Sequence, residues 1–186
     1  MSHMTMPPDI HIETERLVLR SVSTEDVDAI VAGIGDLDVS RMLARVPHPY
    51  RRSDAFGFIT AVRAARGQDI ALTVLAEGAV IGGLGLTGVR TEREFGYWFA
   101  KPAWGKGYAT EAGHGFLAWL FDEVGLDIVR SGVFHDNPAS LNVQHKLGFQ
   151  RIGTHMARCL ARGHDVEHID TLLTRDRYRV LAASPG

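Results

Sequence analysis

Apolar positions in the first seventy residues predict one short strand followed by two helices. The run 16–20 sets apolar residues between charges, as in a strand. Ser23, with a carboxylate three residues later at Asp26, is typical of a helix start, so a helix is expected over about 24–34. Apolar residues at helical spacing predict a second helix over about 53–66.

The period changes to that of a strand from residue 70 onward. Three successive strands are expected over 71–76, 80–87 and 94–100. Glu77-Gly78, between the first two, is typical of a hairpin turn. This part of the chain therefore predicts an antiparallel meander.

The second half of the chain alternates helices with strands. Helices are expected over 108–124 and from Asn137-Pro138 to about Gly148, and strands over 128–134, 149–156 and 169–173, with a polar loop around 163–165. The element order is β-α-α-β-β-β-α-β-α-β-β, a mixed α/β chain. Only the strand-helix-strand unit from Phe95 to Phe134 requires a parallel pair with a right-handed crossover.

Composition narrows the class of protein. The chain has 186 residues, 45% of them apolar and 23% charged, which is usual for one globular domain. A net charge of -2 gives no basic surface for nucleic acid. No apolar run approaches the roughly 20 residues that cross a bilayer. We expect one domain over 9–180, and residues 1–8 disordered or left over from cloning.

Cysteine usage favours a reducing compartment. Cys159 is the only cysteine, so no internal disulfide forms, and we expect a cytoplasmic protein. No base partner for Cys159 can be identified, and it is not expected to act as a nucleophile. The two tail strands can pair across a two-fold axis, which leaves a homodimer open.

Gly105 and Gly107 stand two apart, between a predicted strand and a long predicted helix. Glycines at such a place let backbone N–H groups approach a phosphate, and the helix N-terminus adds a partial positive charge. The turn suits a diphosphate. By itself, a glycine pair is equally typical of an ordinary tight turn.

The same turn resembles a known motif over the stretch Trp104-Gly105-Lys106-Gly107-Tyr108-Ala109-Thr110. It is the motif of the GNAT superfamily of N-acetyltransferases, in which Arg or Gln is followed by two residues, Gly, one residue, and Gly or Ala. Gly107 and Ala109 match the last two anchors. Trp104 stands in place of the Arg or Gln, which resembles the branch of ribosomal-protein alanine N-acetyltransferases (RimJ/RimL type), and it costs the site one polar contact.

The resemblance extends from Ile12 to about Leu173 and implies a GNAT fold that binds acetyl-CoA. Further similar segments are Glu13-Thr14-Glu15-Arg16-Leu17-Val18-Leu19-Arg20, Phe95-Gly96-Tyr97-Trp98, Asn137-Pro138-Ala139-Ser140 and Lys146-Leu147-Gly148-Phe149. This fold is a mostly antiparallel central sheet flanked by helices, with one splayed parallel pair. The pantetheine arm is expected in that gap, bonded to backbone around Trp98, Phe99 and Ala100.

Acetyl transfer to an amine needs a base, an oxyanion donor and a proton for the thiolate. The resemblance implies Glu94 as the base through a water, Ser140 as the proton donor, and Asn137 as a further coenzyme contact. Glu94 is otherwise a surface charge at a strand end. Asn137 is otherwise a helix cap before Pro138.

The histidines invite a metal hypothesis, which we do not adopt. His164, Asp165, His168 and Asp170 cluster in the tail, and His135 and His145 flank the short predicted helix. His164 and His168 have the spacing of a helical zinc pair, but their surroundings predict a strand, in which that spacing separates the ligands. No metal is expected.

The leading hypothesis is an N-acetyltransferase that works by direct transfer in a ternary complex. The acceptor is a primary amine, and the branch resemblance points to a protein N-terminal α-amine, whose pKa of about 8 eases deprotonation. A small-molecule enzyme acting on polyamines, aminoglycosides or amino acids is the alternative, favoured by a narrow acidic pocket built from residues 41–66. An inactive acyl-CoA-binding module is a third reading.

Overall fold

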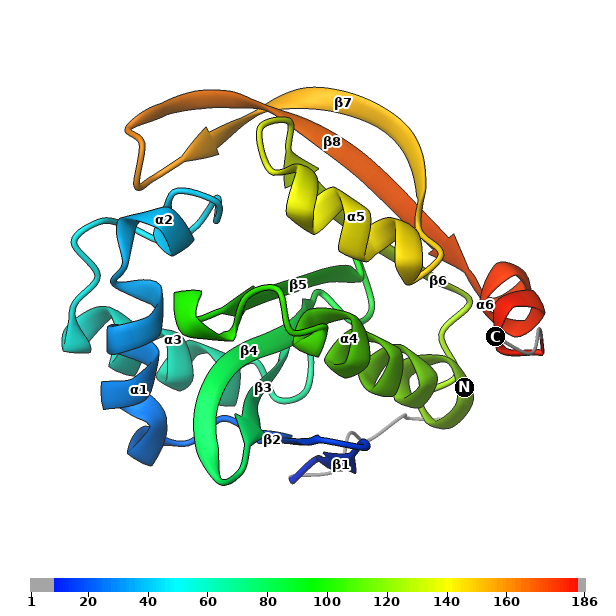
Figure 1. The fold of residues 1–186 in the computed structure, drawn as a ribbon, viewed down its shortest axis with the longest axis horizontal. Coiled ribbons are helices and arrows are strands. Elements are labelled where there is room, and N and C mark those ends of the chain that lie inside the picture. The colour runs from blue at the N-terminus through cyan, green and yellow to red at the C-terminus, as the bar shows by residue number, and fades with distance from the viewer. Residues whose placement is uncertain (1–8, 184–186) are drawn as a thin grey trace.

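Eight strands form a single mixed sheet in the computed structural model, which describes residues 9–183 (Figure 1). Their order is β1-β2-β3-β4-β5-β6-β8-β7. The strands are β1 (His11–Glu13), β2 (Leu17–Ser21), β3 (Ile70–Ala76), β4 (Ala79–Thr87), β5 (Glu94–Phe99), β6 (Ile128–Phe134), β7 (Gln150–Cys159) and β8 (His164–Thr174). The expectation for residues 1–8 lies outside the described part of the chain.

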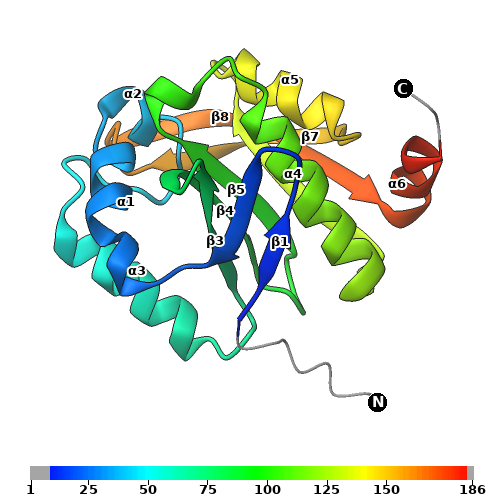
Figure 2. The same cartoon turned by 60° about the horizontal axis from the view of Figure 1, so that its bottom comes forward.

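Helices cover both faces of the sheet (Figures 1 and 2). They are α1 (Val27–Ile34), α2 (Leu37–Ser40), α3 (Arg52–Ala64), α4 (Tyr108–Ala118), α5 (Pro138–Lys146) and α6 (Arg175–Ala182). The helix α1 packs on β4 and β5 and against α3, whereas α4 packs on β1, β2 and β5 and against α5. No described helix combines the length and the apolar character that crossing a membrane requires.

The predicted hairpin and the predicted parallel pair are both present. β3 and β4 pair antiparallel across Glu77-Gly78, and β5 pairs parallel with β6. Ser23 and Asp26 form the expected capping box at the start of the first helical segment. The predicted fold class, a mostly antiparallel mixed sheet with one parallel pair, is confirmed.

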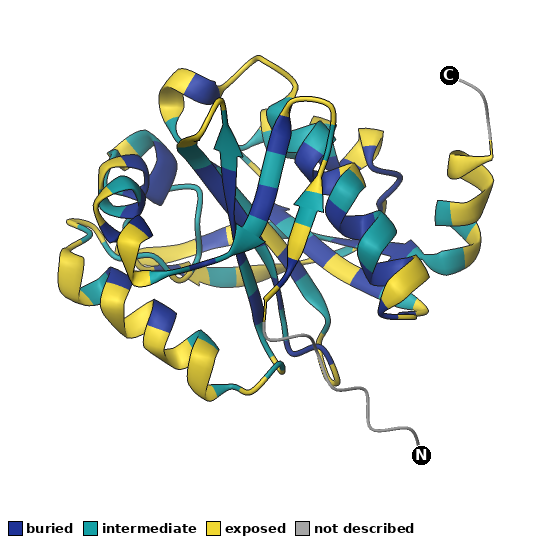
Figure 3. Cartoon of the chain, turned by 90° about the horizontal axis from the view of Figure 1, so that it is seen from below, coloured by how far each residue is buried: buried dark blue, intermediate teal, exposed yellow. Residues whose placement is uncertain are grey.

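The tail of the chain differs from the predicted pattern. β8 already begins at His164, so the loop expected around 163–165 is a tighter turn over 160–163. β7 pairs with β8 along nearly its whole length, and this pairing stabilises the polar half of both strands. The apolar pattern also does not predict α6, because α6 buries none of its residues (Figure 3).

The main core lies between the sheet and α4. Phe95 of β5 stacks on Phe149 with ring centroids 5.9 Å apart, and Phe116 and Leu117 of α4 are buried against this layer. Burial of each such side chain contributes roughly 1.5–3 kcal/mol. This packing fixes α4 firmly, so its N-terminus is held at a constant place beyond the end of β5.

Side chains of β5 point alternately to the two faces of the sheet. Tyr97 points toward α5, where its hydroxyl contacts Ser140. The Trp98 ring lies against α1, so closely that a side chain at Gly33 would meet it at 2.4 Å. Glu94, Gly96 and Trp98 therefore share one face, and Phe95, Tyr97 and Phe99 share the other.

Candidate active site

The turn before α4 holds both glycines in left-handed backbone conformations. Gly105 has φ 74° and Gly107 has φ 81°, values that residues with a Cβ rarely adopt. Gly107 is the N-cap of α4, and the helix begins its hydrogen bonding with Glu111 N donating to Gly107 O at 3.0 Å. The N–H groups of the first turn have no carbonyl partner within the helix, so this end attracts an anion.

A carboxylate and a guanidinium lie against this turn. Glu111 Oε1 accepts from Thr14 Oγ1 at 2.6 Å and from Arg16 N at 2.7 Å, and Glu111 Oε2 accepts from Arg16 Nε at 2.7 Å. Arg16 Nη1 donates to Lys106 O at 3.1 Å, and the guanidinium lies 4.7 Å from the centroid of the Tyr108 ring. Burial raises the pKa of Glu111, but hydrogen bonds from Thr14 and Arg16 outweigh burial and hold that pKa below its ordinary value.

Trp104, which replaces the Arg or Gln of the motif, closes onto the end of β5. Its indole Nε1 donates to Phe99 O at 2.7 Å, and 45% of the residue stays exposed beside the turn. Lys101 is turned away, because its ammonium pairs with Asp38 of α2 at 2.5 Å. Lys106 is thus the lysine that belongs to the turn itself.

β5 and β6 separate soon after they meet. In the described residues the parallel register joins Glu94 with Arg130, and the Arg130 N–H donates to Arg93 O at 2.9 Å. Farther along, Ser131 Oγ rather than backbone bridges to Phe95 O at 2.8 Å. The splayed parallel pair is therefore present, and its gap opens toward the turn.

The backbone groups of β5 that face this gap belong to Tyr97 and Phe99. Ala100 donates its N–H to Ile81 O at 2.9 Å, on the side away from the gap. Because hydrogen bonds alternate along an antiparallel pair, Trp98 also turns its N–H and C=O toward β4. The groups that point into the gap are thus those of Tyr97 and Phe99, and the coenzyme contacts expected at Trp98 and Ala100 stay a prediction.

Ser140 reaches β5 from α5 and is held from two sides. Its N–H donates to Asn137 Oδ1 at 3.1 Å, so Asn137 caps the helix. Its Oγ lies 2.7 Å from Tyr97 Oη, a partner that the sequence pattern did not single out. Burial raises the pKa of Tyr97 to about 12, against the opposing effect of the hydrogen bond with Ser140, so the phenol remains protonated.

Glu94 begins β5 on the face opposite Tyr97. Its carboxylate forms an ion pair with Arg45, from the connection between α2 and α3, and its side chain is 41% exposed. Gly96, next along the same face, borders open space, since a Cβ built there would meet nothing within 4 Å. The Glu94 side chain and Ser140 of α5 thus lie on opposite faces of the sheet.

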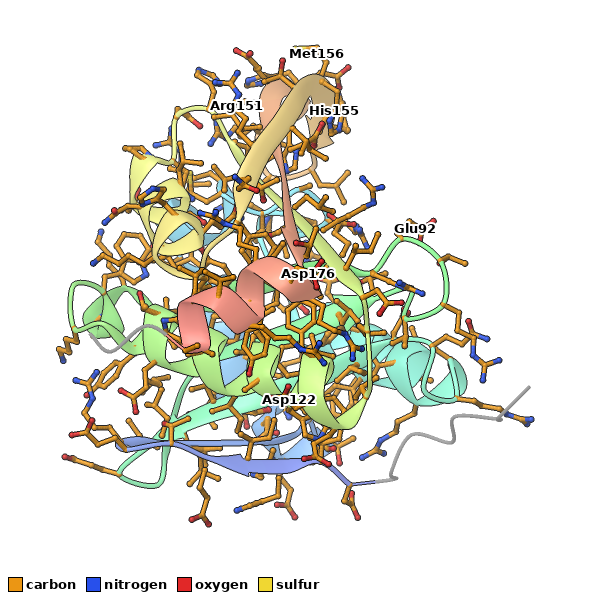
Figure 4. All side chains as sticks on the ribbon, turned by 90° about the vertical axis from the view of Figure 1, so that its right-hand side faces the viewer. Glu92, Asp122, Arg151, His155, Met156 and Asp176 are labelled. Carbon is orange, nitrogen blue, oxygen red and sulfur yellow. The ribbon has the colours of Figure 1, made fainter. Side chains whose placement is uncertain are left out.

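The described residues contain one group that offers metal-ligand atoms. His155 Nδ1 and His168 Nδ1 lie 2.9 Å and 3.1 Å from the two oxygens of Asp170. Burial raises the pKa of Asp170, but the bonds with His155 and His168 outweigh burial and hold that pKa below its usual range. Figure 4 shows His155 standing out from β7. These hydrogen bonds account for the cluster without an ion, and the absence of a metal stays a prediction.

The glycine turn, the splayed parallel pair and the α4 N-terminus define a class of acyltransferase. A family model described as "Acetyltransferase (GNAT) domain" matches residues 16–150, which include the turn, β5 and Ser140. The chain belongs to the GNAT acetyltransferases.

Known proteins share this sequence pattern and fold. "Uncharacterized N-acetyltransferase p20" of Bacillus licheniformis is 28% identical over 147 residues, which cover 75% of this chain and 82% of that protein. Mycobacterium smegmatis RimJ, solved with CoA-disulfide, is similar in fold with a TM-score of 0.79, 20% identity and 96% of each chain covered. Spermidine N-acetyltransferase of Vibrio cholerae, solved with CoA and spermine, is also similar in fold. Its TM-score is 0.77 at 18% identity, and the match covers 88% of this chain and 98% of that one.

Proposed function

We propose that this protein transfers the acetyl group of acetyl-CoA to a primary amine by direct transfer in a ternary complex, and that the acceptor is the N-terminal α-amine of a protein. One observation carries the proposal. Glu94 and the Tyr97–Ser140 pair lie on opposite faces of β5, at the gap where β5 leaves β6. A base for the amine and a proton donor for the thiolate are thus separated by the strand along which the thioester would lie.

The coenzyme would lie along the turn and the gap. The diphosphate would accept hydrogen bonds from the backbone of residues 104–110, supported by the positive end of α4. The pantetheine amides would bond to the gap-facing backbone of Tyr97 and Phe99, and its thiol end would come near Ser140 and Asn137. A metal is not required by this reaction.

Each proton has a named group. Glu94 takes the proton of the attacking amine through a water, which leaves the nitrogen lone pair free to bond to the acetyl carbon. A gap-facing backbone N–H of β5 donates to the oxygen that becomes negative as the new C–N bond forms. As the C–S bond breaks, the Ser140 hydroxyl gives its proton to the sulfur and takes one back from solvent, while Glu94 releases the proton of the amine to solvent. Tyr97, hydrogen-bonded to Ser140, supports that hydroxyl.

The charge of the segment 41–66 favours a protein acceptor over a polyamine. This segment contains six arginines and a single acidic residue, Asp54. Arg45 reaches Glu94 directly. A cationic polyamine needs acidic side chains around it, whereas a peptide presents one amine together with carbonyl oxygens that accept from arginine.

The decisive experiment is thiol release from acetyl-CoA with a panel of N-terminal peptides, polyamines, aminoglycosides and amino acids. We expect turnover with the peptides, and a loss of about a hundredfold in kcat/KM for Glu94→Gln. Glu92→Gln is the matched control, because Glu92 lies two residues away on the loop before β5, and between residues 9 and 183 its side chain hydrogen-bonds to Thr91 alone (Figure 4).

The other outcomes have definite meanings. Turnover only with polyamines would replace the proposed acceptor by the class that the Vibrio cholerae spermidine enzyme acts on. Tight binding of acetyl-CoA with no turnover across the panel would favour a module that binds acyl-CoA without transferring its acyl group. Equal losses in Glu94→Gln and Glu92→Gln would remove Glu94 from the base role.

A further inference from the structure

A negative charge stands at the place where a diphosphate is expected. Glu111 lies in the first turn of α4, and its carboxylate is 16% exposed. Its pKa is held low, so it stays ionised, and an ionised carboxylate repels a diphosphate bound to the same helix end. The site therefore needs a cation that neutralises Glu111 before an anion can bind well.

Arg16 is the cation in contact with that carboxylate. It precedes β2, and Figure 2 shows the β1–β2 connection beside α4. The guanidinium is tied on two edges, with Nε on Glu111 Oε2 at 2.7 Å and Nη1 on Lys106 O at 3.1 Å. The contact with Glu111 also raises the pKa of Arg16, so its charge is permanent.

One edge of the guanidinium remains for a ligand. An arginine carries five N–H donors in a rigid plane, and Nη2 of Arg16 makes no hydrogen bond to any residue between 9 and 183. Nη2 lies 3.5 Å from the position that a Cβ on Gly107 would take, so it borders the N-cap of α4. The side chain is 45% exposed, which leaves this edge open to solvent.

The presence of Trp104 in the motif suggests a role for the Nη2 edge of Arg16. The family pattern has Arg or Gln where this chain has Trp104, and the Trp104 indole donates its N–H to Phe99 O. The turn therefore lacks the polar side chain of its own first position. Arg16 brings a planar, bidentate donor to the same turn from a different strand, which suits two phosphate oxygens.

We propose that Arg16 binds the diphosphate of the coenzyme through its Nη2 edge while its Nε neutralises Glu111. The inference rests on the proposed use of acetyl-CoA, and it assigns a coenzyme ligand outside the glycine turn. A guanidinium–phosphate contact is charge-assisted, so its loss, together with the release of Glu111, should weaken binding by about tenfold or more.

The test measures the affinity of the protein for CoA and for dephospho-CoA by titration calorimetry, and the KM and kcat for acetyl-CoA. Arg16→Ala should weaken both ligands equally, because both contain the diphosphate and only CoA has the 3′-phosphate. It should raise KM and leave kcat at saturation within about twofold. Arg16→Lys, which keeps the charge but loses the fork, should fall between wild type and Arg16→Ala.

Two further variants separate ligand binding from folding. In Arg16→Ala/Glu111→Gln the unpaired carboxylate is gone. This double variant should therefore bind CoA about threefold more tightly than Arg16→Ala does. Arg20→Ala is the matched control, because Arg20 of β2 forms a similar ion pair at 2.6 Å with Asp26, in the helical turn that follows β2. It should lower the melting temperature without changing coenzyme affinity.

Failure of this inference differs from failure of the proposed function. If Arg16→Ala binds CoA as tightly as wild type, or loses affinity for CoA but not for dephospho-CoA, the assignment to the diphosphate is wrong while the acetyltransferase stands. A fall in kcat with unchanged affinity would also overturn it. If wild type itself binds no CoA, the proposed function is wrong.

Discussion

Tyr97 Oη lies 2.7 Å from Ser140 Oγ, joining β5 to α5 across the gap that separates β5 from β6. The two residues are 43 positions apart in the chain. Tyr97 is partly buried, and this burial raises its pKa to about 12, so the phenol is neutral. A protonated phenol thus fixes the orientation of a hydroxyl that is otherwise free to rotate.

This pair predicts a graded loss of turnover. Ser140→Ala should lower kcat by about 10²-fold, since a positioned proton donor contributes that much, and should leave the KM for acetyl-CoA nearly unchanged. Tyr97→Phe should lower kcat by about tenfold, because a water molecule would then have to orient the Ser140 hydroxyl and would do so less well than the phenol. Below pH 10 the kcat of wild type should show no ionisation from Tyr97. Steady-state kinetics across pH 6 to pH 10 measure this, and a loss in Tyr97→Phe larger than that in Ser140→Ala would contradict it.

A second prediction concerns the glycine turn. Gly107→Ala should cost about 1–2 kcal/mol of stability, because φ 81° is strained for a residue with a Cβ. It should also weaken CoA binding, since the strained turn shifts the N–H groups at the start of α4. Gly78→Ala is the control, because Gly78 has φ 79° and nothing within 4 Å of its Cβ position. Calorimetry with CoA should separate the two, and equal affinities would contradict the role of the turn.

Stability should depend on pH through Asp26. Burial raises the pKa of Asp26, but hydrogen bonds from Arg20, the Ser23 N–H and Thr73 outweigh it and leave that pKa below the ordinary value. A lowered pKa in the folded state means that the stabilisation is complete above about pH 4, the unfolded value, and is lost as pH falls through the folded value.

Asp26→Asn should therefore lower the free energy of unfolding by about 2–3 kcal/mol at pH 7, because it leaves Arg20 without its buried partner. The difference from wild type should shrink as the pH falls below about 4. Urea unfolding at several pH values measures both effects. Asp165→Asn, which removes an exposed pair with Arg158 at 3.5 Å, should change stability by less than about 0.5 kcal/mol.

Direct transfer predicts that the single cysteine is dispensable for chemistry. Cys159 is fully buried, and its Sγ lies 3.5 Å from Arg41 O. Cys159→Ala should keep kcat within about twofold and lower stability by about 1–2 kcal/mol through the small cavity it leaves. Mass spectrometry after incubation with acetyl-CoA should find no acetylated Cys159. Loss of turnover in a folded variant, with an acetylated cysteine in wild type, would indicate a covalent mechanism instead.

Local sequence patterns were enough to predict the central unit of the fold. The strand pattern along 71–100 predicts the meander. The helix predicted over 108–124 lies between two predicted strands, and this strand-helix-strand unit predicts the parallel pairing of β5 with β6. The glycines of the turn are likewise visible, because a positive φ restricts the residue type at its own position. The same reasoning misses α6, which is mostly polar and has no fully buried residue, although Tyr178 stacks on Phe121.

What only the tertiary structure decided are contacts between residues far apart in the chain. Arg16 meets Glu111 across 95 positions, Tyr97 meets Ser140 across 43, and His155 meets Asp170 across 15. A residue's own neighbours fix its helix or strand period, but its partners across the fold follow from strand register and helix packing, which the whole sheet settles together. The sequence alone therefore determined the glycine turn and the family it resembles, while the folded chain decided which side chains lie against that turn.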